Sequence, residues 1–153
     1  MKPLALLMVL SAYVAWIATT SPDETPRPDK LDLRLLYDAI RQVETGGHPN
    51  PDMAVGDGGK SHGAYQIGEP HYRDSVEYDR SLRGITFADA VRSERTSELL
   101  MRAYWDRYVP RSDWSYESLA RTHNGGPQGR FKSSTDRYWE RCEKILNSTR
   151  RAK

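Results

Sequence analysis

A stretch crowded with turn-forming residues interrupts the helical pattern of this chain and limits the folds open to it. Residues 31–44 repeat apolar side chains at three- and four-residue steps, which predicts an amphipathic helix. Thr45-Gly46-Gly47 ends that helix, because glycine accepts the left-handed conformation of helix C-termini. Residues 50–67 are rich in Gly, Pro, Asn and Asp and close with Ala-Tyr-Gln-Ile, so we expect a loop with a short, irregular hairpin.

Four further helices are expected after this loop. They cover residues 69–78, beginning with Glu-Pro; 86–109, with Thr86 and Asp89 as a capping box; 115–124, ended by Gly-Gly-Pro; and 133–146, with Ser133 and Asp136 as a second capping box. On the longest of these, Val91, Leu99, Tyr104 and Tyr108 should pack inward. The predicted fold class is mainly α, of the α+β type, with one small β-rich hairpin after the first helix. A ligand cleft between the helical body and this β element is the natural expectation.

The two ends of the N-terminal region differ in composition. Residues 1–20 carry Lys2 and then an uncharged apolar run, which is typical of a secretory signal peptide. No clean Ala-x-Ala cleavage site follows, so an uncleaved N-terminal anchor is the alternative. Residues 21–30 form a proline-rich linker, and the folded domain is expected over residues 31–148. In either case the domain should lie outside the cytoplasm, as a secreted, periplasmic or extracellular protein.

Charge and cysteine content narrow the classes of partner. The net charge is +2, which suits an anionic surface such as a bacterial wall and is far below that of a nucleic-acid-binding domain. We expect a monomer with no stable membrane partner beyond the N-terminal segment. The single cysteine, Cys142, rules out an intrachain disulfide and is expected to be a small buried apolar residue. The four histidines lack metal-ligand spacing, and neither a metal nor another cofactor is expected.

Three sequence blocks resemble, in order and spacing, the invertebrate-type (destabilase-like) lysozymes. They read "VETGG", "SHGAYQIGEPHYRDS" and "YESLARTHNGGPQGRFKSSTDRYWERCEKI", and the agreement extends from about Leu35 to Leu146. The resemblance implies a lysozyme-like helical domain. That family is usually dense in disulfides, whereas its cysteine positions here read Gly47, His62 and Ser75. This chain is therefore expected to be a cysteine-poor member whose core holds by packing.

The resemblance implies Glu44 as the general acid of a glycosidase. Its predicted place at the C-terminal end of a helix independently favours a protonated carboxyl, because the helix dipole is negative there. Asp57 is the nearest match for the second carboxylate, among glycines whose backbone amides could keep it ionised, and Asp52 is an outside candidate. A retaining reaction, which the family implies, would require the two carboxyl groups to lie about 5 to 5.5 Å apart.

Five other residues are candidates for substrate binding: Ser61, Tyr65, Gln66, His123 and Asn124. Their hydroxyl, phenol, imidazole and amide groups suit hydrogen bonding and stacking to an N-acetylated sugar. Structural roles compete with this interpretation. Ser61 could be a turn hydroxyl, Gln66 a buried amide tying the hairpin to the helices, and His123 a structural histidine.

Two further interpretations are less favoured. The tryptophans and tyrosines at 104, 105, 108, 114, 138 and 139 could stack on sugars, but their helical positions favour packing. Some members of the family are credited with an isopeptidase activity that uses serine, histidine and lysine. Ser61 and His123 match that set, but the lysine position reads Gly68, so we expect no isopeptidase activity.

The sequence thus predicts a muramidase that cleaves the β-1,4 bond between N-acetylmuramic acid and N-acetylglucosamine in peptidoglycan. One alternative is a lytic transglycosylase, which would use Glu44 alone and leave an anhydro sugar. The other is a wall-binding protein without catalytic activity.

Overall fold

The computed structural model describes residues 31–46 and 48–152. The expected signal or anchor at 1–20 and the linker at 21–30 lie outside the described residues. The described helices are α1 (Leu33–Thr45), α2 (Glu69–Tyr78), α3 (Phe87–Val91), α4 (Glu94–Tyr108), α5 (Tyr116–Gly125) and α6 (Asp136–Arg151). Single 3-10 turns lie at Pro51–Met53, Arg80–Leu82, Arg111–Asp113, Gly129–Phe131 and Ser133–Thr135. The expected domain end at residue 148 falls inside α6.

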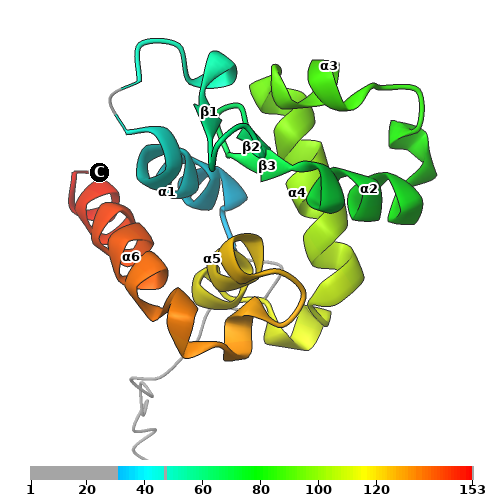
Figure 1. Cartoon of the computed structure of the whole chain (residues 1–153). Helices are drawn as coiled ribbons and strands as arrows, with labels where there is room; N and C mark the ends of the chain where they lie inside the picture. Colours follow the sequence, from blue (N-terminus) through cyan, green and yellow to red (C-terminus); the bar gives the residue numbers. More distant parts are fainter. Residues whose placement is uncertain (1–30, 47, 153) are drawn as a thin grey trace, which may run out of the picture.

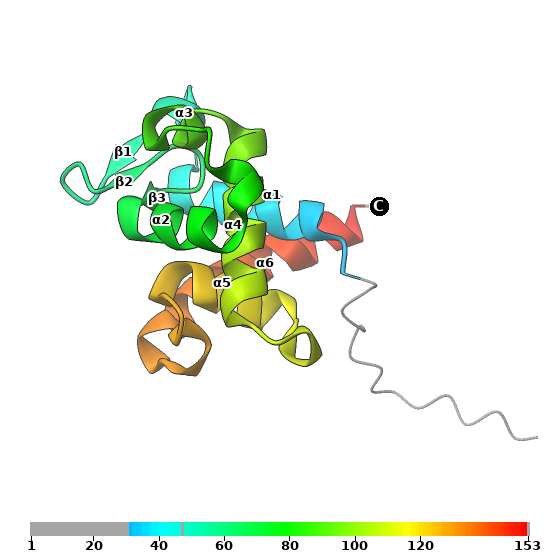
Figure 2. The same cartoon turned by 90° about the vertical axis from the view of Figure 1, so that its right-hand side faces the viewer.

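The β element is a three-stranded antiparallel sheet in the order β1 (Val55–Gly56), β2 (Ser61–His62) and β3 (Ile67–Gly68). Gly56 lies opposite Ser61, and Ser61 lies opposite Gly68. The β1–β2 hairpin projects from the helical body (Figure 2). A mainly helical fold with one small hairpin after the first helix is therefore confirmed.

Helix α6 packs along α1 although the two are far apart in sequence (Figure 1). Tyr138, Cys142 and Leu146, spaced four residues apart, form the buried face of α6. On α1 the buried residues include Leu36 and Ile40, both fully enclosed. This pairing fixes the end of α1, where Glu44 lies, against the C-terminal helix.

Two predictions about helices are wrong. The single helix expected over 86–109 breaks after Val91, and Ser93 caps a new helix by accepting a hydrogen bond from the Thr96 amide. Within α4, Leu100 and Tyr104 are four residues apart and share the buried face, whereas Leu99, which was expected to pack inward, is exposed. The second capping box is also absent from the described chain, since α6 begins at Asp136 and its N-cap residue, Thr135, makes no side-chain cap bond.

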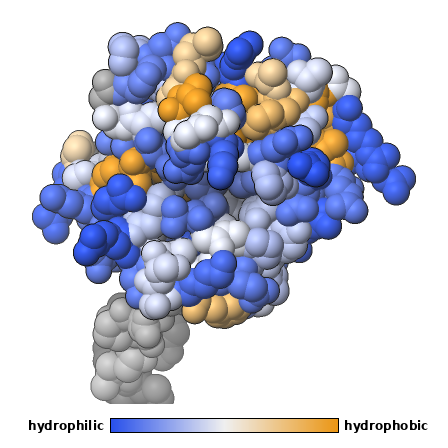
Figure 3. All heavy atoms as spheres, viewed as in Figure 1, coloured by the Kyte–Doolittle hydropathy of each residue, from blue (hydrophilic) through white to orange (hydrophobic). Residues whose placement is uncertain are grey.

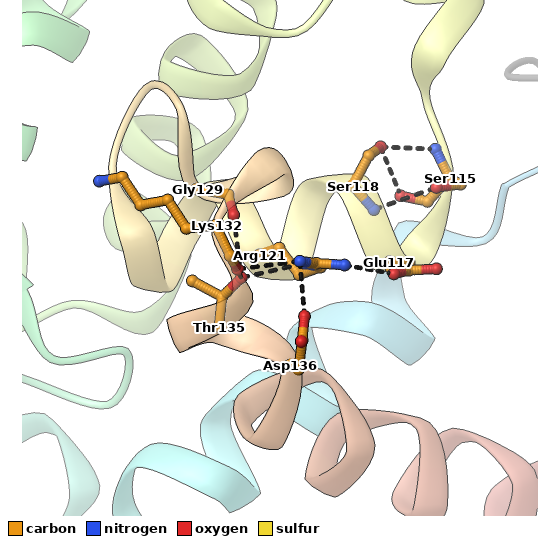
Figure 4. Close-up of polar contacts among 8 residues, drawn as sticks. All are labelled: Ser115, Glu117, Ser118, Arg121, Gly129, Lys132, Thr135 and Asp136. Carbon is orange, nitrogen blue, oxygen red and sulfur yellow. Dashed lines mark hydrogen bonds and ion pairs between the residues drawn. The ribbon is translucent and has the colours of Figure 1, made fainter.

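Thr135 belongs instead to a cluster centred on Arg121 of α5 (Figure 4). The Arg121 Nε donates to Thr135 Oγ1 at 2.9 Å, and its terminal nitrogens reach Glu117, Asp136 and the Lys132 carbonyl oxygen at 2.7 to 2.9 Å. The Arg121 side chain is only 15% exposed. One guanidinium therefore joins α5 to the start of α6, which helps to hold the two helices that lie beside the end of α1.

The face of the molecule seen in Figure 3 is largely polar. Figure 3 shows a mostly hydrophilic face, with apolar residues gathered in patches in its upper half. Among the described residues, none of the helices combines the length and the apolar character needed to cross a bilayer.

Candidate active site

Glu44 lies in the last turn of α1, at the edge of a cleft between the helices and the hairpin. The cleft has a volume of about 300 Å³. Its lining includes Asp57, Ser61, Gln66, His123 and Asn124 together with Glu44. Six of the seven residues predicted from the sequence are thus brought to one hollow, by α1, the hairpin, the segment before β3, and α5.

The Glu44 side chain is largely shielded from solvent, and one of its carboxyl oxygens accepts a hydrogen bond. This side chain is 19% exposed. The Tyr138 hydroxyl donates to Glu44 Oε1 at 2.8 Å, and the Nε2 of His123 lies 3.7 Å from the same oxygen. The Glu44 carboxyl is therefore held by a hydrogen bond from α6 and lies beside His123 of α5. The Glu44 side chain also lines the cleft.

Asp57 occupies the turn of the β1–β2 hairpin and is exposed. Its φ of +49° is in the left-handed region, which aspartate tolerates better than most residues. The expectation that backbone amides surround its carboxylate is wrong in detail, because the Gly59 and Lys60 amides donate to the Gly56 carbonyl oxygen. The donor to Asp57 Oδ2 is the Ser61 hydroxyl, at 2.9 Å. Ser61 therefore holds the carboxylate as well as lining the cleft.

Asp52, the outside candidate, lies elsewhere. It lines a separate hollow of about 60 Å³ beside His62 and Val91. Of the two candidate aspartates, Asp57 is the one that shares a cleft with Glu44.

Tyr65 requires a correction, because its side chain belongs to the core. It is 1% exposed, and its hydroxyl donates to Glu98 at 2.7 Å. Burial, and then the hydrogen bond to Glu98, raise the pKa of this phenol far above its ordinary range. The side chain cannot offer a face to a sugar. Its carbonyl oxygen, however, lies 3.0 Å from His123 Nε2.

The Gln66 side chain points toward the cleft, whereas that of Tyr65 points into the core. Gln66 has a φ of +50°, and its Nε2 donates to the Gly63 carbonyl oxygen at 2.9 Å. Its side-chain oxygen also occupies the space that a Cβ on Gly56 would need, so Gly56 allows the close approach. Gln66 and Glu44 together border a second open hollow of about 500 Å³ on the side of His48 and Val55. The groove therefore continues on both sides of Glu44.

His123 is held in one tautomer by its neighbours. A carbonyl oxygen only accepts, so the Nε2 that faces Tyr65 must carry the hydrogen. The side chain is 3% exposed, and its Nδ1 is buried without a hydrogen-bond partner among the described residues. His123 Nδ1 and His71 Nε2, both on residues that line the cleft, are thus two buried nitrogens without a hydrogen-bond partner in the described part of the chain.

Among the side chains of the cleft wall, the sequence did not indicate His71, and it favoured a packing role for Tyr104, which also lines the cleft. Their rings stack with centroids 3.9 Å apart, and the His71 ring meets that of His123 edge-on at 5.5 Å. Burial, and then the neighbouring His123, hold the pKa of His71 well below its ordinary value, so the ring is neutral. Pro70 is the sequence feature that could have identified His71. Proline is common in the first turn of a helix, so the residue after it lies at the start of the helix that follows the hairpin.

A shielded glutamate and an exposed aspartate thus border one groove, between a helical body and a small sheet. The chain is 31% identical over 104 residues to an invertebrate-type lysozyme of Ruditapes philippinarum, covering 68% of this chain and 74% of that protein. It is 36% identical over 81 residues to a lysozyme of Magallana gigas, covering 52% of this chain and 56% of the other.

A solved structure agrees with these relatives. The crystal structure of Tapes japonica lysozyme superimposes with a TM-score of 0.61 at 29% identity, covering 73% of this chain and 89% of that one. No family model matches the sequence. The chain belongs to the invertebrate-type lysozyme family. It is accordingly an enzyme, a muramidase.

Proposed function

We propose that Glu44 and Asp57 carry out a retaining hydrolysis of the β-1,4 bond between N-acetylmuramic acid and N-acetylglucosamine in bacterial peptidoglycan. The observation that supports this most is that both carboxyl groups border one cleft. Glu44 gives its proton to the leaving glycosidic oxygen while the Asp57 carboxylate attacks the anomeric carbon. Water then cleaves the glycosyl ester, and Glu44 takes back a proton from that water.

The unequal surroundings of the two acids support this division of roles. Glu44 is mostly shielded from solvent, whereas Asp57 is exposed and accepts a hydrogen bond from Ser61. Glycoside cleavage needs one carboxyl group that donates a proton to the leaving oxygen and a second that faces the anomeric carbon. We therefore assign proton donation to Glu44 and nucleophilic attack to Asp57.

A polymeric substrate fits the shape of the groove. The two hollows share Glu44 and Gln66, so a glycan strand can extend to both sides of the acid. Ser61, Gln66, His123 and Asn124 are the proposed substrate-binding side chains, since all four line the cleft.

Mass spectrometry of a peptidoglycan digest tests this assignment. The wild-type enzyme should release fragments with reducing ends, Glu44→Gln should release none, and Asp57→Asn should cut the rate at least about a hundredfold. Anhydro sugars with full activity of Asp57→Asn would instead indicate a lytic transglycosylase. Wall binding without any product would indicate a binding protein.

Retention needs its own measurement, since both stereochemical outcomes give products of the same mass. Proton NMR of a soluble oligosaccharide digest, read before mutarotation, should show the β-anomer first. The α-anomer as first product would contradict a covalent role for Asp57.

Three further expectations concern the whole protein. We propose that it acts outside the cytoplasm, as the apolar segment 1–20 suggests, and that it works as a monomer. We also propose that it lacks isopeptidase activity, because Gly68 stands at the lysine position of the resembling block. Release of lysine from a γ-glutamyl-lysine substrate, lost in Ser61→Ala, would contradict the last of these.

A further inference from the structure

The buried tyrosine beneath Glu44 has a geometry that core packing alone does not explain. Tyr138 is 3% exposed and comes from α6, at a separation of 94 residues from Glu44. Its hydroxyl donates to Glu44 Oε1 at 2.8 Å. A phenol in the interior needs a partner for its hydroxyl, but this one finds it in the carboxyl assigned to proton transfer.

The two oxygens of Glu44 are not equivalent. Oε1 accepts from Tyr138 and has the hydrogen-bearing Nε2 of His123 at 3.7 Å. Oε2 receives no hydrogen bond from the residues that the structure describes. A protonated carboxyl whose one oxygen already accepts a hydrogen bond carries its proton on the other oxygen. The proton of Glu44 is thus directed to Oε2.

We propose that Tyr138 is a positioning residue of the reaction: its hydroxyl reserves Oε2 of Glu44 for the transferred proton and stabilises the charge that develops on the carboxyl as that proton leaves. The inference rests on the proposed role of Glu44 as the acid. The hydrogen bond from Tyr138 is stronger to an ionised carboxylate than to a neutral carboxyl. It therefore favours the transition state over the ground state, which is the condition for accelerating a chemical step.

The surroundings keep Tyr138 a donor throughout the working range of the enzyme. Burial, and then the Glu44 charge, raise the pKa of its hydroxyl well above the ordinary value. Beside it, burial and then the same charge raise the pKa of the Cys142 thiol to about 12, so the thiol stays neutral. The titratable or charged groups around Glu44 are Tyr138, Arg141 and Cys142 from α6, His123 from α5, Tyr104 from α4, His71 from α2, Asp57 from the hairpin and His48 from the segment after α1.

The test compares Tyr138→Phe with the wild-type enzyme on soluble peptidoglycan fragments. We expect kcat to fall about tenfold while KM stays within about twofold, because the interaction is made chiefly in the transition state. We also expect the alkaline limb of kcat/KM to move to higher pH. Loss of a donor disfavours the ionised carboxylate, so the acid keeps its proton to higher pH.

Tyr72→Phe is the matched control, because the Tyr72 hydroxyl donates to the Ile85 carbonyl oxygen at 2.6 Å, away from the acid. It should lose some thermal stability and keep the wild-type pH profile. If Tyr138→Phe lowers the folded fraction, the pH at which its activity halves still reports on the molecules that are folded. A wild-type kcat and alkaline limb in Tyr138→Phe, or equal shifts in Tyr72→Phe, would overturn the proposal.

Glu44→Gln, measured in parallel, separates the two ideas. An inactive Glu44→Gln with an unaltered Tyr138→Phe would contradict the role of Tyr138 alone. An active Glu44→Gln would contradict the proposed function itself.

Discussion

Asp57 and Gln66 are the non-glycine residues with positive φ in the described part of the chain, and both line the cleft. Each conformation costs free energy, of the order of 1 kcal/mol, that must be offset by the surrounding structure. The Asp57 carboxylate accepts a hydrogen bond from the Ser61 hydroxyl, and the Gln66 side chain donates one to the Gly63 carbonyl oxygen. The hairpin thus holds polar side chains in place at some expense of stability.

Tyr65 and Gln66 illustrate how adjacent residues divide between core and cleft. Tyr65 and Ile67 are each 1% exposed, while Gln66 between them faces the groove. The two residues lie in the turn between β2 and β3, where the left-handed backbone of Gln66 allows its side chain to point away from the core that holds Tyr65. A strand-like alternation could not have predicted this division, because Ala64 and Tyr65 are both buried.

Tyr65→Phe should destabilise the protein without loss of lytic activity. The substitution removes the hydrogen bond to Glu98, and we expect the free energy of unfolding to fall by about 1–2 kcal/mol. Urea unfolding and a wall-lysis assay below the transition measure the two effects. A large loss of kcat in fully folded Tyr65→Phe would restore a direct role for the phenol.

At the scale of elements, local sequence signals were sufficient wherever a helix is bounded by strong caps. Residues 69–78 form α2 with the expected bounds, and Ser115 caps α5 with Ser118 in a reciprocal pair. Of the two wrong predictions, the break before α4 reflects a local cap at Ser93 that was not recognised, and the other arises where tertiary contacts outweigh a local motif. Thr135 makes no side-chain cap bond on α6, because its hydroxyl is engaged with Arg121 and the Gly129 carbonyl oxygen.

The same limit applies to the candidate site. The quoted blocks directed attention to Glu44 and Asp57, but the hydrogen bond from Tyr138 depends on how α6 packs along α1. No local spacing encodes that contact. Helical periodicity placed Tyr138 correctly on a buried face, and only the fold places its hydroxyl at the acid.

Arg121→Lys tests the cluster that joins α5 to α6. A lysine ammonium cannot reproduce the forked contacts to Thr135, Glu117 and Asp136, so we expect a loss of about 2–3 kcal/mol in stability. The control is Arg73→Lys, whose side chain is 68% exposed in an ion pair with Glu69 and should change stability by less than about 0.5 kcal/mol. Equal stability of the two variants would contradict the structural role of Arg121.

Considered as a whole, the molecule folds around one buried core without a disulfide. The chain has a single cysteine, Cys142, which is fully buried. At two positions where the resembling family has cysteine, this chain has side chains that make noncovalent contacts. Ser75 is buried and its hydroxyl lies 2.9 Å from the Leu100 carbonyl oxygen, and the His62 ring packs edge-on against Phe87 at 5.5 Å.

Thiol reductants should therefore leave the enzyme unchanged. Millimolar dithiothreitol is expected to alter neither the lytic rate nor the midpoint of thermal unfolding, because the folded chain contains no bond that it can reduce. Scanning calorimetry with and without the reductant measures this. A fall of several degrees would indicate an intermolecular disulfide through Cys142.

The hydrogen bond between Tyr138 and Glu44 has a consequence for the order in which the enzyme is made. Synthesis proceeds from the N-terminus, so among the described helices α1 is made first and α6 after the others. The hydroxyl that holds Glu44 is present only after 94 further residues, ending with Tyr138, have been added. A nascent chain, or one cut before its last helix, carries the glutamate without its support. The supported acid is thus a property of a chain that extends beyond Tyr138, and a shorter chain should cleave the wall more slowly.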